Sequence, residues 1–133
     1  MIYIVDTSLK CNFENRPEGP CTYCYNTEAR RRVREQEIVD FEAIEETLRE
    51  KYSVSPGVII LHGGEPLFME EKILEKLLKM SLELSGRSSF QTNGSLISDK
   101  KIELLRQYKT RVGVSIDGYW PANRWRGKTK KNT

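Results

Sequence analysis

Cysteine is scarce in this sequence, because its 133 residues contain only three and all of these lie within the first 24 positions. An odd number of cysteines at one end of the chain excludes a disulfide scaffold, which needs an even count and a secreted context. No run approaches the roughly 18 apolar residues that a membrane-spanning helix requires. Residues 1–5 contain no basic region or cleavage site, so the sequence predicts a cytoplasmic protein without a membrane partner.

Charge of one sign is also limited: Lys and Arg number 22 against 19 Asp and Glu, which gives a formal net charge of +3. This excess is too small to favour a nucleic-acid partner. After Asp117 the chain nevertheless carries only basic charges, at Arg124, Arg126, Lys128, Lys130 and Lys131. We interpret the polar basic tail, residues 127–133, as a solvated end of the chain, with contact to phosphate or RNA as the alternative.

A composition of 38% hydrophobic and 31% charged residues is typical of a globular protein. The length suits one domain, residues 1–133, with one modest core. Residues 1–6 are apolar and β-branched and predict a strand, which the polar loop 7–26 follows. Apolar residues at steps of three and four then predict a helix over about 38–52.

The same order of strand and helix recurs twice more along the chain. The apolar run 58–61 predicts a strand that is buried on both faces, and 69–86 an amphipathic helix. Residues 88–91 predict a short third strand, Ser98 the N-cap of a third helix, and 112–116 a fourth strand. Four strands separated by three helices predict an α/β fold with a parallel sheet.

An unusual segment follows each of the four predicted strands. The cysteine loop follows the first, a Gly-Gly-Glu-Pro motif the second, Thr92-Asn93-Gly94 the third, and Ser115 with Asp117 the fourth. Ligands bind at the carboxyl ends of parallel strands, so these segments are expected to form one site. Taken alone, Asn93 is interpreted as a turn residue.

The three cysteines suit a metal or an iron–sulfur cluster. Cys11, Cys21 and Cys24 could bind three irons of a cubane and leave the fourth open to a substrate. A structural zinc site formed by the same cysteines and His62 explains the spacing equally well. A thioredoxin-like role is disfavoured because the motif lies in a long loop. The cysteines alone therefore leave iron–sulfur and zinc open.

The Gly-Gly-Glu-Pro motif follows the second predicted strand. Gly63 and Gly64 would let the backbone approach a ligand closely, and Glu65 would offer a carboxylate to a positively charged group. Pro66 would lead into a helix whose N-terminus favours negative charge. The motif thus fits an amino-acid ligand, with an ordinary turn as the alternative. His62, the only histidine, is interpreted as packed or hydrogen-bonded at the strand end, with a role in tuning the substrate pocket as the alternative.

In this order the segments resemble the radical SAM superfamily from residue 1 to about 126, and most closely the anaerobic sulfatase-maturating and SPASM peptide-modifying enzymes. The resemblance implies a partial TIM-type (β/α) barrel with about four βα units of the usual six. It also implies a radical SAM oxidoreductase, in which a [4Fe–4S] cluster cleaves S-adenosylmethionine (SAM) to a 5′-deoxyadenosyl radical that abstracts hydrogen from a substrate.

The resemblance further implies residue roles and partners. Cys11, Cys21 and Cys24 would ligate the cluster. SAM would be bound by Tyr23, Gly63, Gly64, Glu65, Pro66, Asn93, Ser115, Asp117 and Arg126, with Arg124 as the alternative to Arg126. An electron donor such as flavodoxin or ferredoxin is expected. The expected substrate is a peptide or protein, with a small molecule or nucleoside as the alternative.

Two features depart from the superfamily pattern. Nine residues separate Cys11 from Cys21, where three are usual. A threefold longer loop costs about 1 kcal/mol of closure entropy, so cluster binding stays reasonable. The chain also stops after the fourth strand and has no further cysteines for auxiliary clusters. A second chain or a missing C-terminal part is therefore expected to complete the barrel. The alternatives to a SAM-cleaving enzyme are a zinc-stabilised binding module without catalysis and an inactive truncated member of the superfamily.

Overall fold

The computed structural model describes residues 1–17, 19–33 and 39–118. Arg124, Arg126 and the basic tail 127–133 lie outside these residues. Along the chain, the elements are β1 (Ile2–Ser8), α1 (Asn26–Val33), α2 (Phe41–Val54), β2 (Val58–Gly63), the 3-10 helix η2 (Pro66–Phe68), α3 (Glu71–Ser85), β3 (Ser88–Thr92), α4 (Asp99–Gln107) and β4 (Thr110–Val114).

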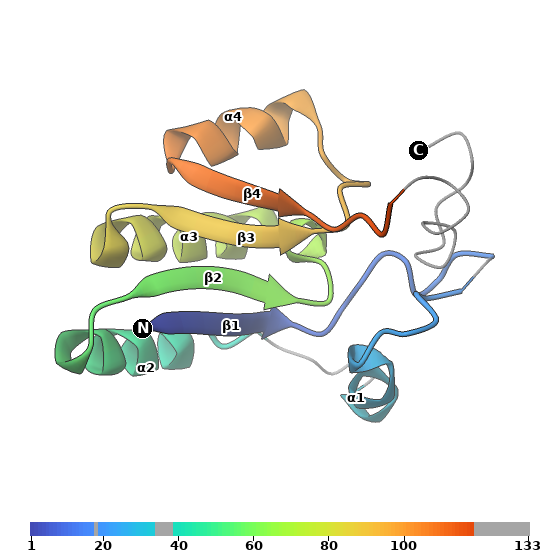
Figure 1. The fold of residues 1–133 in the computed structure, drawn as a ribbon, viewed down its shortest axis with the longest axis horizontal. Helices are drawn as coiled ribbons and strands as arrows, with labels where there is room; N and C mark the ends of the chain where they lie inside the picture. The colour runs from blue at the N-terminus through green and yellow to red at the C-terminus, as the bar shows by residue number, and fades with distance from the viewer. Residues whose placement is uncertain (18, 34–38, 119–133) are drawn as a thin grey trace.

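The four strands form one parallel sheet in the order β1-β2-β3-β4. In Figure 1 all four arrows point the same way, toward the side on which the cysteine loop and α1 lie. This arrangement confirms the predicted α/β fold of parallel strands with interleaved helices. It also brings the four segments that follow the strands to the same edge of the sheet.

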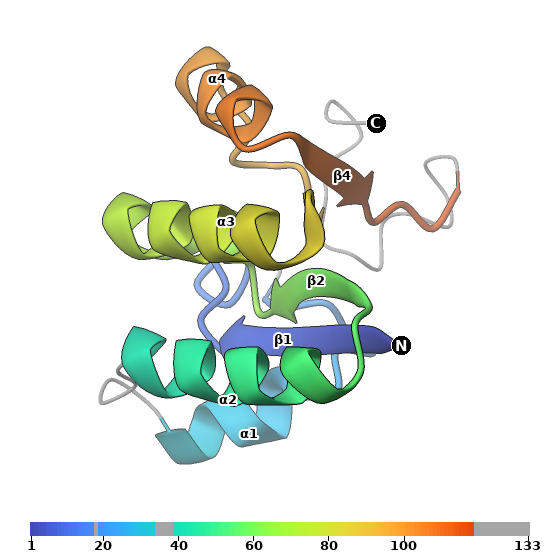
Figure 2. The same ribbon diagram turned by 90° about the vertical axis from the view of Figure 1, so that its left-hand side faces the viewer.

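Helices cover one face of the sheet. Figure 2 shows α2 and α3 on the same side of the strands. The core lies between these layers, and its most deeply buried side chains from β2, β3 and α3 are Ile59, Leu61, Phe90, Leu74, Leu77 and Leu78. Successive residues of a strand face opposite sides of a sheet, so the neighbours of these strand residues lie on the other face.

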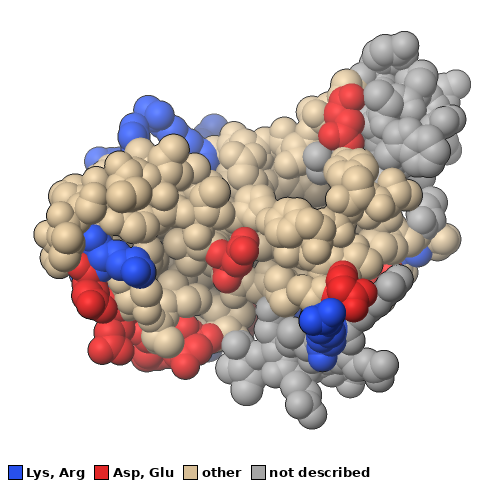
Figure 3. Space-filling view, turned by 60° about the horizontal axis from the view of Figure 1, so that its bottom comes forward, with Lys and Arg blue, Asp and Glu red and all other residues tan. Residues whose placement is uncertain are grey.

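That other face is largely open among the described elements. Ile2 and Ile4 of β1 are 64% and 65% exposed, and Val58 and Ile60 of β2 are only half-buried. Figure 3, seen from the β1 edge, shows mostly uncharged side chains on the surface. The prediction that 58–61 is buried on both faces is therefore wrong. A continuous apolar run shows that a strand can be covered twice, not that it is.

Polar side chains set several helix boundaries. Asp40 accepts a hydrogen bond from Ala43 N at 2.9 Å, so α2 begins at Phe41 rather than near residue 38. Ser98 accepts from Lys101 N at 3.4 Å, which confirms it as the N-cap of α4. The sequence did not predict α1, because this segment is polar and arginine-rich and has only Ala29 and Val33 as apolar residues.

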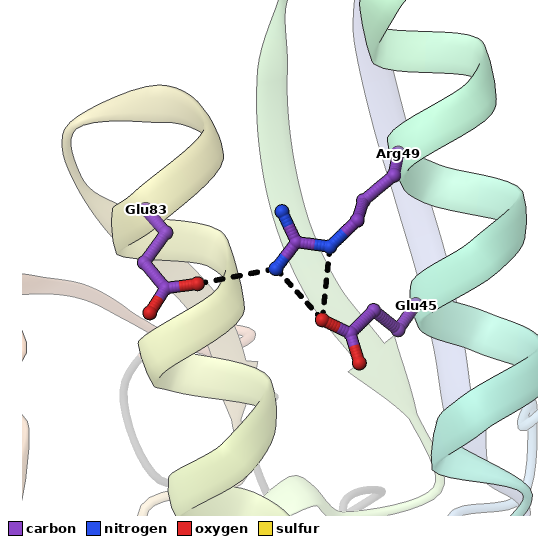
Figure 4. Close-up of polar contacts among 3 residues, drawn as sticks. All are labelled: Glu45, Arg49 and Glu83. Atoms are coloured by element: carbon purple, nitrogen blue, oxygen red, sulfur yellow. Dashed lines mark hydrogen bonds and ion pairs between the residues drawn. The ribbon is translucent and has the colours of Figure 1, made fainter.

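A surface ion pair joins α2 to α3 away from the strand ends. The Arg49 guanidinium donates to Glu45 at 2.7 Å and to Glu83 at 3.1 Å, as Figure 4 shows. The hydrogen bonds to both carboxylates raise the pKa of Arg49. Exposed pairs of this kind contribute little to stability.

Candidate functional site

A cavity of about 190 Å³ lies at the carboxyl ends of the strands. Residues at the ends of all four strands line the cavity. The segment after β1 contributes the most, with Cys11, Phe13, Pro20, Cys21, Tyr23, Cys24, Tyr25 and Asn26. The others are His62, Gly63 and Gly64 at the end of β2, Gln91, Thr92 and Asn93 at the end of β3, and Ser115 after β4. The convergence expected from the sequence is therefore present in the structure.

The three thiols share this cavity. Cys11, Cys21 and Cys24 are half-buried, and none forms a disulfide. In the described ranges, no group of three or more His, Cys, Asp or Glu side chains is arranged to hold a metal ion. A cubane holds its thiolates on separate irons, so it needs three thiols around one cavity rather than thiols that meet at a point. The donor set fits such a cluster, and ligation by these cysteines stays a prediction.

Asn93 connects the end of β3 to the cysteine loop. Its Nδ2 donates to Asn12 Oδ1 at 3.0 Å and lies 4.0 Å from Cys11 Sγ, within the range of a hydrogen bond to sulfur. Its Oδ1 accepts from Ser95 N at 2.9 Å and from Ser95 Oγ at 2.6 Å. Asn93 therefore makes the turn that the sequence indicated, and it also positions the first cysteine.

The two glycines of the Gly-Gly-Glu-Pro motif pack against the cysteine loop. A Cβ on Gly64 would lie 2.2 Å from the carbonyl oxygen of Lys10, and one on Gly63 would lie 2.3 Å from that of Ser8. Gly64 N also donates to Ser8 O at 2.7 Å. Gly63 has a φ of 129°, which side chains rarely adopt. Both glycines thus allow the cysteine loop to approach closely, and their contact with a ligand stays a prediction.

Glu65 is 1% exposed, and both of its carboxylate oxygens accept hydrogen bonds from the protein. Oε1 accepts from Thr92 Oγ1 at 2.6 Å and from Leu67 N at 3.1 Å, and Oε2 accepts from Asn93 N at 2.7 Å. Contact of Glu65 with a ligand ammonium stays a prediction. In the structure this side chain ties the end of β2 to the end of β3.

Pro66 occupies the first turn of η2, as the sequence indicated for a helix start. This 3-10 helix has three residues and is separate from α3, which begins at Glu71. Glu65 is the N-cap of η2 and accepts from Leu67 N. The motif therefore leads into a short 3-10 turn, and the helix expected over 69–86 is α3, which begins at Glu71.

Tyr23, which lines the cavity, forms a contact with Asp117. The Tyr23 hydroxyl donates to Asp117 Oδ2, which joins the cysteine loop to the segment after β4. Ser115 N donates to Thr92 O at 2.9 Å, which fixes Ser115 beside the end of β3. These sequence-predicted residues are therefore brought together. Arg126 and its alternative Arg124 lie outside the described residues.

The sequence reasoning missed a polar cluster beside the cavity. His62 Nδ1 lies 3.2 Å from Asp6 Oδ1 and 3.1 Å from the Tyr25 hydroxyl, and the two rings stack. Burial, followed by the negative charge of Asp6, raises the pKa of Tyr25. The signal in the sequence was positional, because Asp6 and His62 each stand near the end of a predicted strand. The expectation that His62 is hydrogen-bonded at a strand end is confirmed.

Comparison with known proteins identifies the family. The sequence profile of the Radical SAM superfamily matches residues 7–133. The chain belongs to the radical SAM superfamily. Its similarity to the cysteine-type anaerobic sulfatase-maturating enzyme of Clostridium perfringens is 28% identity over 88% of the chain and 32% of that relative. For the serine-type anaerobic sulfatase-maturating enzyme of Bacteroides thetaiotaomicron, the values are 33% over 74% of the chain and 26% of the relative.

The chain is also similar to an uncharacterised protein of Methanothermobacter thermautotrophicus, with 29% identity over 74% of the chain and 38% of the relative's length. The chain thus spans about a third of the length of these curated relatives. The suggested relation to sulfatase-maturating enzymes is confirmed at the level of sequence similarity. Among the described helices of this superfamily member, none is long and apolar enough to cross a membrane.

Proposed function

We propose that Cys11, Cys21 and Cys24 hold a [4Fe–4S] cluster and that SAM binds against it in the cavity at the strand ends. The observation that carries the proposal is the sharing of one cavity by three thiols and by the ends of β2, β3 and β4. Membership of the radical SAM superfamily supports the same chemistry. When bound, the cluster would supply the electron that splits SAM into methionine and a 5′-deoxyadenosyl radical, which takes hydrogen from a substrate.

The chain's own residues would prepare the cluster site before loading. The Asn93 amide donates toward Cys11 Sγ and holds Asn12 beside it, so the first ligand is fixed relative to β3. Phe13, which is 4% exposed, and Pro20 form an apolar part of the cavity wall. Hydrogen bonds to cysteine sulfur and an apolar surround both influence the reduction potential of such a centre.

The same residues would shape the SAM pocket. Under this proposal, backbone groups of Gly63, Gly64 and Glu65 contact the methionine ammonium, because the Glu65 carboxylate already accepts three protein hydrogen bonds. Tyr23 would lie beside the adenine, and its contact with Asp117 would hold the ring over the cavity mouth. Ser115 would reach the ribose or the carboxylate of SAM.

Anaerobic reconstitution with iron and sulfide tests the proposal. The wild-type chain should take up about four irons, show broad visible absorption that dithionite bleaches, and change its electron paramagnetic resonance spectrum when SAM is added. Cys21→Ser should lose most of this absorption. Thr22→Ala, an exposed neighbour in the same loop, is the matched control and should load like wild type.

Two other results would contradict parts of the proposal. A chain that purifies with one zinc and takes up no iron would favour the zinc-stabilised binding module. A chain that loads the cluster but yields no 5′-deoxyadenosine with dithionite and SAM would favour an inactive member of the superfamily. Assays of metal content and of 5′-deoxyadenosine by chromatography separate these cases.

For the substrate we propose a peptide or protein, because two of the similar proteins are named as maturating enzymes of sulfatases. A peptide with a central Cys or Ser should then raise 5′-deoxyadenosine production above the rate with SAM alone. A small molecule or nucleoside is the alternative substrate, and in that case it, rather than the peptide, should raise 5′-deoxyadenosine production. We propose flavodoxin or ferredoxin as the physiological electron donor.

We also propose that a second chain or a further C-terminal part completes the barrel. The sheet in the described residues has β1 and β4 as its edges, and Ile2 and Ile4 on its helix-free face are largely exposed. Unpaired edges and exposed apolar strands favour pairing with further strands. Adding the second chain or the further C-terminal part should raise the rate of SAM cleavage by the cluster-loaded chain. An unchanged rate would contradict the proposal that the barrel is completed in this way.

A further inference from the structure

The imidazole of His62 occupies an unusual position on the helix-free face. His62 is the chain's only histidine, and it pairs with Asp6 in the parallel register of β1 and β2. Its Nδ1 lies 3.2 Å from Asp6 Oδ1. The side chains of His62 and Asp6 are 31% and 53% exposed, so both are accessible to solvent. His62 also lines the cavity that holds the three thiols.

The chemistry of the two groups decides which ring nitrogen carries hydrogen. An ionised carboxylate has only acceptor lone pairs, so the contact with Asp6 is attractive only when His62 Nδ1 bears a proton. In the neutral ring, Nε2 is then an acceptor. In the described residues, the contacts of the His62 ring with Asp6 and Tyr25 both involve Nδ1, and Nε2 has no hydrogen-bond partner.

We infer that His62 Nε2 is a hydrogen-bond acceptor on the cavity wall for an N–H or O–H group of the bound molecule, and that Asp6 is the positioning residue that keeps it so. Asp6 and Tyr25 both contact Nδ1, so Nε2 is the ring nitrogen left for a molecule in the cavity that His62 lines. The identity of the bound molecule rests on the proposed function. The tautomer of His62 exists without cluster or SAM.

Tyr25 offers the competing arrangement. Its hydroxyl lies 3.1 Å from His62 Nδ1, and a phenol can donate as well as accept. If Tyr25 donated to Nδ1, the proton of the ring would sit on Nε2, and His62 would present a donor to the cavity. The contact with Asp6 thus makes Nε2 an acceptor, whereas donation by Tyr25 would make it a donor. Separate variants of Asp6 and Tyr25 distinguish them.

Nitrogen-15 NMR of the full, metal-free chain at mildly alkaline pH tests the inference directly. A single histidine gives one imidazole spin system, which needs no assignment. We expect the Nδ1–H tautomer to dominate in wild type and in Tyr25→Phe. In Asp6→Asn its ratio to the Nε2–H tautomer should fall about tenfold, since a charge-assisted hydrogen bond is lost. Asp99→Asn, an exposed carboxylate on α4, is the matched control and should leave the ratio unchanged.

Reaction with diethyl pyrocarbonate provides the second measurement, because this reagent modifies accessible unprotonated ring nitrogens. Mass spectrometry of the His62 peptide should show modification in the folded wild type as well as in the urea-unfolded chain, because Nε2 is unprotonated and accessible. A dominant Nε2–H tautomer in wild type, or a change in Tyr25→Phe alone, would overturn the inference. So would a folded chain that resists the reagent while the urea-unfolded chain reacts. Each result is independent of cluster loading, so failure of the proposed function is seen separately.

Discussion

Glu65→Gln is the substitution for which the structure gives the sharpest expectation. The Glu65 carboxylate is 1% exposed and accepts from the backbone N–H groups of Leu67 and Asn93 and from the Thr92 hydroxyl. Glutamine keeps the shape of the side chain but replaces one acceptor oxygen with an NH₂ donor. The Thr92 hydroxyl can rotate to accept from that donor, but a backbone N–H cannot.

Whichever way the new amide is turned, one buried backbone N–H faces a donor. Turned one way, the NH₂ group meets Asn93 N, and turned the other way it meets Leu67 N. A buried donor that loses its partner costs about 1–3 kcal/mol. We therefore expect Glu65→Gln to lower the free energy of unfolding by about 2 kcal/mol. Glu65→Ala, which removes the acceptor for all three donors, should lower it further.

Urea unfolding of the metal-free chain, followed by far-ultraviolet circular dichroism, measures this change. With a slope of about 1–3 kcal/mol per molar urea, the midpoint should fall by on the order of 1 M. Glu46→Gln on the exposed side of α2 makes the same chemical change and should stay within about 0.5 kcal/mol of wild type. An unchanged midpoint for Glu65→Gln, together with loss of SAM binding after reconstitution, would refute the internal role and show a carboxylate that faces the ligand.

Three further outcomes are expected. Asn93→Ala removes the amide donor near Cys11 and should raise the rate of iron loss from the reconstituted chain to a chelator about tenfold; an unchanged rate would leave Asn93 as a turn residue only. Gly64→Ala places a Cβ 2.2 Å from a backbone carbonyl of the cysteine loop and should lower thermal stability by about 1–3 kcal/mol, as circular dichroism melting will show. The hydrogen bond to Glu75 raises the pKa of Tyr108 above its ordinary value of 10.0. The stability that this hydrogen bond contributes is therefore fully present below pH 10 and is lost as the pH rises through the higher pKa of the folded state. Tyr108→Phe should flatten the alkaline fall of the urea midpoint.

The sequence was sufficient to predict which segments meet. Successive βα units place the carboxyl ends of parallel strands at one edge, so the cysteine loop and Asn93 had to approach each other once the strands were recognised. The cap at Ser98 was equally local, because an N-cap depends on a few neighbouring residues. These predictions rest on rules that need no knowledge of tertiary packing.

The partners of individual side chains could not be predicted in the same way. A glutamate after two glycines looks the same in the sequence whether it faces a ligand or accepts from Thr92 and Asn93. The run 58–61 likewise does not reveal that helices cover only one of its faces. Both outcomes depend on what lies beside the strand in space, which the spacing of residues along one segment does not encode.

The contacts at the strand ends form a connected series around the cavity. Glu65 joins β2 to β3, Asn93 joins β3 to the cysteine loop, and Tyr23 joins that loop to Asp117 after β4. The buried link at Glu65 lies between the sheet and Asn93, and Asn93 in turn approaches Cys11. A substitution at Glu65 should therefore disturb the position of Cys11 as well as the stability of the fold. A substitution that removes the exposed Tyr23–Asp117 contact should leave Cys11 in place, because Asn93 at the end of β3 still holds the cysteine loop.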